Sequence, residues 1–595
     1  MCGFVGFNYL NKEVLKKALN EINHRGPDGS NIILSNGFSI GHNLLSIRGD
    51  ISKSIQPISN INSKWILVFN GQIYNLKELK MKLDQEYKIE EIDTIILYEI
   101  INRFGWNFID HIEGMFSIAL LNKDTSEIRL YRDESGQKPL YYSQVENNFF
   151  FASEIKSLLS LGVNKDIDQN AISYFCHLGY IPGKKTIFKN IKKVLPGQVL
   201  GFTESKGLYT SCFTNLSEKS HNKYSFDCLR QDMISLVDDH LQSKTKISLN
   251  LSGGMDSSSL LWAAKQSNKK VTAITTFFKD GLEKYNEEAK LAKELCKTLN
   301  VDHEILEISN IDYLDNFISS YESIEEPNGN NDLPLYFLMA KKHKYENNTV
   351  IISGDGGDET WGGYSYHHMS LKHDSKMFPM NKYKFQNIFL RKAFLNVNNP
   401  VDRYLYYRSL IPAFTKNKIN SLKKYLKKEF NFLFQNSNFK NLSKTQQMFV
   451  IERACWLSEE NFLRSDKIYM SQSLEVRSPF ADRSFRNSFT RKFSSSDLWA
   501  DGYSKAPLRD SLDGYLPDSI NRRKRKVGWH SPIDDSWYKK DIKSLMLDLF
   551  DRDDTEAIDW KNLRNFVLKT EKYPGKFVNY YASLAIIGNL YNIDL

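Results

Sequence analysis

The sequence lacks the long apolar runs that membrane proteins need. No part of the chain approaches the roughly 18 consecutive apolar residues that a transmembrane helix requires. The first residues, MCGFVGFNYL, also lack the basic segment and the long apolar segment of a secretory signal. We therefore expect a chain that has no membrane partner.

Cysteine is scarce, and its spacing excludes further classes of protein. The six cysteines are scattered and form no Cys-x-x-Cys pair, which argues against a zinc site or a disulfide framework. The net charge of +9 is modest for 595 residues, and we find no basic arm or RNA-binding module. These absences predict a cytoplasmic protein that has no nucleic-acid partner.

Short strands dominate the first third of the chain. Segments such as WILVFN, MFSIALL and NFFFAS are separated by turn residues, and apolar residues recur at helical spacing near 14–22 and 92–104. Strands in hairpin series with helices outside them predict an α+β layered sandwich. We place this first domain at residues 2–205 and a polar linker at 206–224.

Beyond the linker, strands and helices alternate. Strand-like segments such as 246–251, 271–278 and 349–352 are each followed or preceded by a helical segment. This order is typical of an α/β doubly wound parallel sheet, which binds ligands at the carboxyl ends of its strands. The pattern then becomes mainly helical, so residues 225–595 predict such a sheet with a helical C-terminal extension.

The first of these strands leads into the segment SGGMDSS and then into an apolar helix. Glycines let backbone N–H groups approach phosphate, serine hydroxyls add donors, and a helix N-terminus favours negative charge. Asp256 would repel phosphate unless a cation lay between them, so we predict that it holds Mg²⁺. An ordinary Gly/Ser turn is the alternative. The residues expected to bind ATP here are Leu251, Ser252, Gly253, Gly254, Asp256, Ser257 and Ser258.

A second loop, SGDGGDE at residues 353–359, also follows an apolar strand. Both loops would leave the same edge of a parallel sheet. We therefore expect Ser353 and Gly354 to join the ATP site and Asp358 to share Mg²⁺ with Asp256. A solvated acidic turn is the alternative for this loop.

The two loops resemble those of a known family. SGGxDSS resembles the signature of the ATP-pyrophosphatase superfamily, whose members adenylate a carboxylate or amide oxygen and release pyrophosphate. The second loop with its following GGY, and the later segment SLEVRSPF, resemble the asparagine synthetase branch. The resemblance implies that Asp355 faces the acceptor. It also implies that Lys526, or its rival Lys524, stabilises charge during adenylation and amide formation.

The N-terminal region resembles the N-terminal-nucleophile glutamine amidotransferase domain of the same family. The segments that carry this resemblance are Cys2-Gly3, HRGPDG, FNGQIYN, KPLYY and ASEIK. It implies that Cys2 attacks the glutamine amide, that the Asn70 side chain and the Gly71 N–H hold the oxyanion, and that Asp93 binds the substrate amino group. If Met1 is removed, the α-amino group of Cys2 can act as the general base.

Two positions in this region depart from the family. Leu44 stands where the family has the arginine that pairs with the glutamine α-carboxylate, and Gln72 replaces a carboxylate near the substrate ammonium. Leucine cannot form a bidentate pair with a carboxylate. We therefore expect either a weaker affinity for glutamine or another residue, such as Arg48, in that role beside Gln72 and Asp93.

Together these features predict an enzyme that adenylates a small carboxylate with ATP and converts it to an amide with ammonia from glutamine. L-Aspartate is the default acceptor. The alternatives are amidation of another acid in a specialised pathway, a glutamine-independent adenylating amide synthetase, and a tRNA-modifying enzyme. The sequence leaves a homodimer open.

Overall fold

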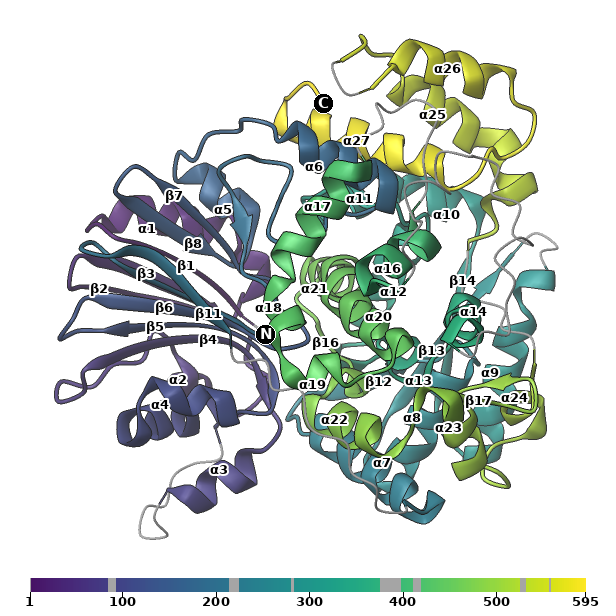
Figure 1. The fold of residues 1–595 in the computed structure, drawn as a ribbon, viewed down its shortest axis with the longest axis horizontal. Helices are drawn as coiled ribbons and strands as arrows, with labels where there is room; N and C mark the ends of the chain where they lie inside the picture. Colours follow the sequence, from purple (N-terminus) through teal and green to yellow (C-terminus); the bar gives the residue numbers. More distant parts are fainter. Residues whose placement is uncertain are drawn as a thin grey trace.

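A layered antiparallel region and a parallel-sheet region lie side by side in the computed structural model (Figure 1). The structure describes residues 2–83, 92–212, 224–279, 283–374, 398–409, 419–524, 531–555 and 558–595. The first region is coloured purple to blue in Figure 1, and the second teal to yellow.

Two antiparallel sheets form the first region. Their strand orders are β2-β3-β1-β8-β7-β9 and β11-β10-β6-β5-β4. Apolar side chains from both sheets, including Phe4, Val68, Phe151 and Leu200, pack together between them. The strands are β1 (Gly3–Phe7), β2 (Gly29–Ser35), β3 (Phe38–Leu44), β4 (Trp65–Ile73), β5 (Gly114–Asn122), β6 (Glu127–Arg132), β7 (Tyr141–Val145), β8 (Asn148–Ala152), β9 (Lys192–Lys193), β10 (Gln198–Thr203) and β11 (Gly207–Cys212).

Helices cover the outer faces of these sheets. Side chains of β1 alternate, so that Phe4 points between the sheets while Val5 and Phe7 pack outward in the cluster that holds Leu15 of α1. The outer helices are α1 (Lys12–Asn20), α3 (Leu76–Lys82), α4 (Asp93–Phe104), α5 (Ile155–Ser160) and α6 (Gln169–Leu178). The predicted α+β layered sandwich is therefore confirmed. Strand β11 takes up the first part of the predicted linker, and residues 213–223 lie outside the described residues.

Five parallel strands form the sheet of the second region, in the order β14-β13-β12-β15-β16. They are β12 (Lys246–Asn250), β13 (Thr272–Phe278), β14 (His303–Ile308), β15 (Asn348–Ile352) and β16 (Glu475–Arg477). The doubly wound parallel sheet is thus confirmed. Strand β16 comes from the part of the chain that was expected to be mainly helical, because a strand of three residues is too short to show a period.

Helices flank this sheet and build the C-terminal extension. Those before β16 are α7 (Phe226–His240), α8 (Met255–Gln266), α9 (Glu287–Leu299), α10 (Asn310–Asp315), α11 (Phe317–Glu322), α12 (Leu333–Tyr345), α13 (Gly357–Trp361), α14 (Ser365–Asp374), α16 (Pro400–Arg408), α17 (Ile419–Glu429), α18 (Asn431–Gln435), α19 (Ser437–Lys440), α20 (Lys444–Glu452), the π-helical segment η5 (Arg453–Phe462) and α21 (Leu463–Met470). Those after it include α22 (Arg483–Lys492), α23 (Ala506–Ser511), α24 (Asp518–Asn521), α25 (Lys543–Leu549), α26 (Trp560–Lys569) and α27 (Phe577–Tyr591).

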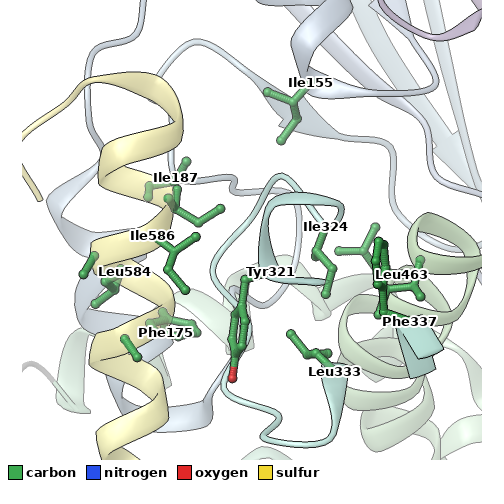
Figure 2. Packing of buried hydrophobic residues seen from close by; sticks show 14 of the residues in the cluster. Ile155, Phe175, Ile187, Tyr321, Ile324, Leu333, Phe337, Leu463, Leu584 and Ile586 are labelled. Atoms are coloured by element: carbon green, nitrogen blue, oxygen red, sulfur yellow. The ribbon is translucent and has the colours of Figure 1, made fainter. Parts of the chain in front are cut away.

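The two regions share one apolar core. Figure 2 shows Phe175 of α6 beside Leu584 and Ile586 of α27, with Tyr321 of α11 nearby. The same cluster continues to Val5 in β1. Because burying apolar surface is the main favourable term in folding, this shared core holds the regions in one arrangement. Among the helices in the described part of the chain, none combines the length and apolar character needed to cross a bilayer.

Candidate active sites

Cys2 lies at the start of the inner strand β1, where the first region meets the second. Its side chain is only 7% exposed. Its backbone N–H donates to Asn70 Oδ1 at 2.9 Å, and its carbonyl accepts from Arg25 Nε at 3.2 Å. The two main-chain groups of Cys2 are therefore fixed, and its thiol has a defined position.

The surroundings of the Cys2 thiol oppose its ionisation. Burial raises the pKa of the thiol above its ordinary value, and the carboxylates of Asp93 and Glu475 raise it further. A hydrogen bond from the backbone N–H of Leu45 acts in the opposite direction. A thiolate at this place therefore needs a nearby base or a bound cation.

The two predicted oxyanion donors are adjacent on β4, beside Cys2. Because Asn70 Oδ1 accepts from Cys2, the side-chain amide has its Nδ2 as donor, 3.4 Å from Ser117 Oγ. At Gly71 the backbone lies so close to β5 that an added Cβ would be 2.0 Å from the carbonyl oxygen of Met115. This close approach requires glycine and presents the backbone of residue 71 directly to the site.

A cavity opens beside Cys2. It brings together the predicted glutamine-binding residues Arg48, Gln72 and Asp93, and also Leu44. Burial raises the pKa of Asp93, while the positive charge of Arg48 lowers it. The residues that line the cavity are Cys2, Leu44, Leu45, Ser46, Ile47, Arg48, Ser54, Gln56, Phe69, Gly71, Gln72, Asp93, Thr94 and Glu475.

Glu475, which also lines this cavity, belongs to strand β16 of the other region and was not among the predicted site residues. The fully buried Arg477 on the same strand donates from Nε to Glu475 Oε1 at 2.6 Å and from Nη2 to Gln72 Oε1 at 3.0 Å. Its Nη1 donates to the carbonyl oxygens of His240 and Gln242. In the sequence, Glu475 and Arg477 both lie in the segment SLEVRSPF, which resembles the asparagine synthetase family but does not by itself indicate their place beside the cavity.

The second site lies at the carboxyl ends of β12 and β15. Ser252 N–H donates to Ser257 Oγ at 3.2 Å, and Gly254 N–H donates to Ser252 Oγ at 3.2 Å. At Gly253, with φ of +80°, an added Cβ would lie 2.2 Å from the carbonyl oxygen of Glu288. The chain therefore turns tightly here, as a loop that presents N–H groups to phosphate must.

The remaining predicted ATP-binding residues flank this turn. Leu251 is buried and accepts through its carbonyl from Thr275 Oγ1, and Ser258 is buried within α8. Gly354, which comes shortly after β15, lies next to the first loop: an added Cβ there would be 3.2 Å from Asp256 Cβ. Ser353 Oγ donates to Asp355 Oδ2 at 2.9 Å. The two loops therefore meet, as their places in the sheet predicted.

A lysine that was not among the predicted site residues joins the two loops. Lys505 Nζ forms ion pairs with Asp256 and with Asp358, the latter at 2.7 Å. At Gly357 an added Cβ would lie 2.6 Å from Asp256 Cγ, so the absence of a side chain there lets the loops approach. Nothing in the local sequence SKAPLR marks Lys505.

Lys505 combines burial, charge and an uncommon backbone conformation. Its residue is 3% exposed, and its φ of +60° lies in the left-handed region, which residues other than glycine rarely occupy outside functional sites and turns. Burial disfavours the ammonium, but Asp256 and Asp358 more than offset this and raise the pKa of Lys505. The lysine is therefore charged at neutral pH.

Asp355 and Lys524 have defined surroundings in the structure. Asp355 Oδ2 accepts from Ser465 Oγ of α21 at 3.0 Å as well as from Ser353. Lys526 lies outside the described residues. Lys524 Nζ is 5.2 Å from the ring centre of Tyr503, two residues before Lys505.

The chemistry of the acidic pair fits Mg²⁺. This ion is usually held by one or two carboxylates together with phosphate oxygens of a substrate. Among the described residues, no group of three or more His, Cys, Asp and Glu side chains could hold a metal by itself. Asp256 and Asp358 would therefore supply part of a magnesium site, with the nucleotide supplying other ligands, and Lys505 would exchange its ion pairs with them for contacts to phosphate.

Both regions match known proteins. The family model described as "Glutamine amidotransferase domain" matches residues 1–213, and the one described as "Asparagine synthase" matches residues 229–584. Asparagine synthetase [glutamine-hydrolyzing] 1 of Bacillus subtilis (strain 168) is 27% identical over 590 residues, which cover 94% of this chain and 91% of that protein. Asparagine synthetase B [glutamine-hydrolyzing] of Escherichia coli (strain K12) is 27% identical over 376 residues, 60% of this chain and 63% of that protein.

A solved structure shares part of the chain at lower similarity. Glutamine phosphoribosylpyrophosphate amidotransferase from B. subtilis aligns with 52% of this chain and 81% of its own, with 15% identity and a TM-score of 0.29.

Proposed function

The chain belongs to the asparagine synthase family, and from this premise we propose that it converts L-aspartate to L-asparagine, with ATP as the activating substrate and glutamine as the nitrogen source. The main support for this proposal is that one chain holds two candidate sites, one in each of its two packed regions. One site has a buried thiol beside a charged pocket, and the other has two acidic loops joined by Lys505. We take residues 2–205 as the glutaminase domain and 225–595 as the synthetase domain.

In the glutaminase domain, Cys2 Sγ attacks the side-chain amide carbon of glutamine. Asn70 Nδ2 and the Gly71 N–H stabilise the oxyanion of the tetrahedral intermediate. Collapse of this intermediate expels ammonia and leaves a thioester on Cys2, which water hydrolyses to glutamate. Asp93, Gln72 and Arg48 hold the amino-acid end of the substrate.

In the synthetase domain, a carboxylate oxygen of the acceptor attacks the α-phosphorus of ATP, and pyrophosphate leaves. The loop from Leu251 to Ser258 holds the phosphates together with Ser353 and Gly354. Asp256 and Asp358 would hold Mg²⁺, which supplies charge neutralisation on the phosphate oxygens.

In this proposal the buried cation of Lys505 binds the departing pyrophosphate. Lys526 keeps the role implied by the family resemblance, which is to stabilise charge during adenylation and amide formation. Ammonia then attacks the acyl carbon of the adenylate, and AMP leaves as the amide forms. Asp355, held by the hydroxyls of Ser353 and Ser465, faces the acceptor in this proposal.

The test is release of AMP and pyrophosphate across a panel of carboxylic acids, with glutamine and then ammonium as nitrogen source. We expect aspartate to give asparagine and pyrophosphate in equal amounts. Cys2→Ala should abolish the glutamine-driven product and retain the ammonium-driven product. If the protein were inert toward aspartate but active on another acid, that acid would take the place of aspartate in the proposal. Equal activity of wild type and Cys2→Ala with glutamine would remove glutamine from the proposal.

A further inference from the structure

The cavity beside Cys2 contains an acidic side chain from the synthetase domain. Glu475 is 1% exposed and lies on β16, more than 470 residues from Cys2 in the chain, yet both line the same cavity. Through this strand, the parallel sheet contributes directly to the pocket of the other domain.

The charges in this cavity are complementary to those of a free amino acid, which carries one ammonium and one carboxylate. Its lining holds two carboxylates, Asp93 and Glu475, and one guanidinium, Arg48. The two carboxylates repel one another electrostatically. The charge of Glu475 adds to the effect of burial in raising the pKa of Asp93. Arg477 offsets part of this negative charge at Glu475 Oε1, and a cation in the cavity itself would offset the rest. The α-ammonium of glutamine is such a cation, and Arg48 suits its α-carboxylate.

Gln72 cannot provide the second negative charge, because its side chain is a neutral amide. Its Oε1 accepts from Arg477 Nη2 at 3.0 Å, which turns the amide oxygen toward the synthetase domain. The same guanidinium holds Glu475 Oε1 at 2.6 Å. Arg477 therefore aligns one amide and one carboxylate, from two domains, along the pocket wall.

We propose that Glu475 binds the α-ammonium of glutamine together with Asp93, so that the synthetase domain completes the substrate site of the glutaminase domain. This inference rests on the proposed function. The strand that carries Glu475 also supports the ATP site, because the carbonyl oxygen of Arg477 accepts from the N–H of Ser353 at 2.9 Å. One short strand thus borders both substrates.

The test compares glutamine with 4-carbamoylbutanoate, which is glutamine without its α-amino group. Glu475→Gln should lower kcat/KM for glutamine by roughly 10- to 100-fold, the loss expected for a hydrogen bond to a charged group. The value for 4-carbamoylbutanoate should change little, so that the preference for glutamine falls by nearly the same factor. A merely structural role for Glu475 would lower both values in parallel and leave the preference unchanged.

Two further variants make the outcome decisive. Glu113→Gln removes another carboxylate at the domain interface, which pairs with Arg483 at 2.7 Å but does not line the cavity, and it should leave the preference unchanged. Glu475→Asp keeps a charge for Arg477 and decides the matter if Glu475→Gln does not fold. It should lower the preference for glutamine by a smaller factor.

The result that overturns the inference is an unchanged preference in folded Glu475→Gln or Glu475→Asp. A wild-type protein that neither hydrolyses nor binds glutamine would overturn the proposed function as well. That failure is seen in the wild type alone and is therefore distinguishable from a failure of the Glu475 assignment.

Discussion

At the scale of single residues, Lys505 determines the electrostatics of the synthetase site. It brings one positive charge to two buried carboxylates, Asp256 and Asp358, that come from separate loops. Its left-handed backbone conformation directs the side chain between them at the start of α23. A lysine held this way is charged before any nucleotide arrives.

Replacing this lysine should disable adenylation while sparing the other domain. We expect Lys505→Met to lower the rate of aspartate-dependent pyrophosphate release by about 100-fold or more, because the negative charge that develops on the leaving group loses a buried cation. Glutamine hydrolysis should change little. Both rates are measured on the same preparation.

Lys270→Met is the control, since Lys270 pairs with Asp302 on the surface, just before the amino end of β13 and so at the opposite edge of the sheet from the acidic loops, and the variant should retain pyrophosphate release. If the two variants behaved alike, Lys505 would have no special part in the reaction. Lys526→Met, measured in the same assay, tests the role that family resemblance gives to Lys526.

At the scale of elements, the loop before α13 packs closely against the start of α8. Gly357 begins this helix, and its missing side chain leaves room for Asp256 at the start of α8. Strand β16 pairs with β15 and carries Glu475, which lines the cavity beside Cys2. The spacing of these elements therefore controls both the separation of the two acidic loops and their connection to the cavity beside Cys2.

A methyl group at residue 357 should disturb this spacing. Gly357→Ala would place Cβ 2.6 Å from Asp256 Cγ, so one of the loops must move. We expect a weaker affinity for ATP and a cost of roughly 1–3 kcal/mol in the free energy of unfolding, which is typical of overpacking.

The affinity is measured by titration with ATP and Mg²⁺, and the stability by denaturant unfolding. Gly29→Ala is the control, because its Cβ would meet only Leu44 Cβ at 4.0 Å. An unchanged affinity for ATP in Gly357→Ala would show that the close approach of the loops is dispensable.

At the scale of the whole molecule, buried ion pairs supplement the shared apolar core. Glu459 of η5 pairs with Arg132 at 3.0 Å and with Lys193 at 2.7 Å, both from the glutaminase domain. Arg25, which contacts the carbonyl oxygen of Cys2, pairs in the same way with Asp466 of α21 at 2.8 Å. The position of Cys2 is thereby tied to the parallel-sheet region.

Removing the charge of Glu459 should loosen the docking of the domains. Glu459→Gln leaves Arg132 and Lys193 buried without this counter-charge, and breaking a buried pair costs about 3–5 kcal/mol. We expect a lower melting temperature and more glutamate formed per asparagine, because ammonia escapes from a loosened interface.

The ratio of glutamate to asparagine is measured at saturating ATP and aspartate. Glu113→Gln, at the more exposed pair with Arg483, should leave this ratio near the wild-type value. A stable Glu459→Gln protein with an unchanged ratio would show that this ion network does not maintain the coupling.

Much of the fold could be predicted from the sequence, because its signals are local. The change from hairpin strands to alternating strands and helices predicted both architectures, and each was confirmed. The two glycine-rich loops could be recognised because glycine and serine between a strand and a helix have a direct structural meaning, and their binding of ATP stays a prediction. The family inferred from these motifs is also confirmed by the comparisons. The three-residue strand β16 escaped prediction because it is too short to establish a period.

What the sequence determined by itself was the order of the elements and the loops that close them, since these follow from residues within about one helical turn or one strand. The tertiary structure alone decided which distant charges meet. Lys505 contacts Asp256 across 249 residues, and Arg477 contacts Gln72 across 405. Contacts of this kind depend on how sheets and domains pack, and no local pattern of residue types encodes them.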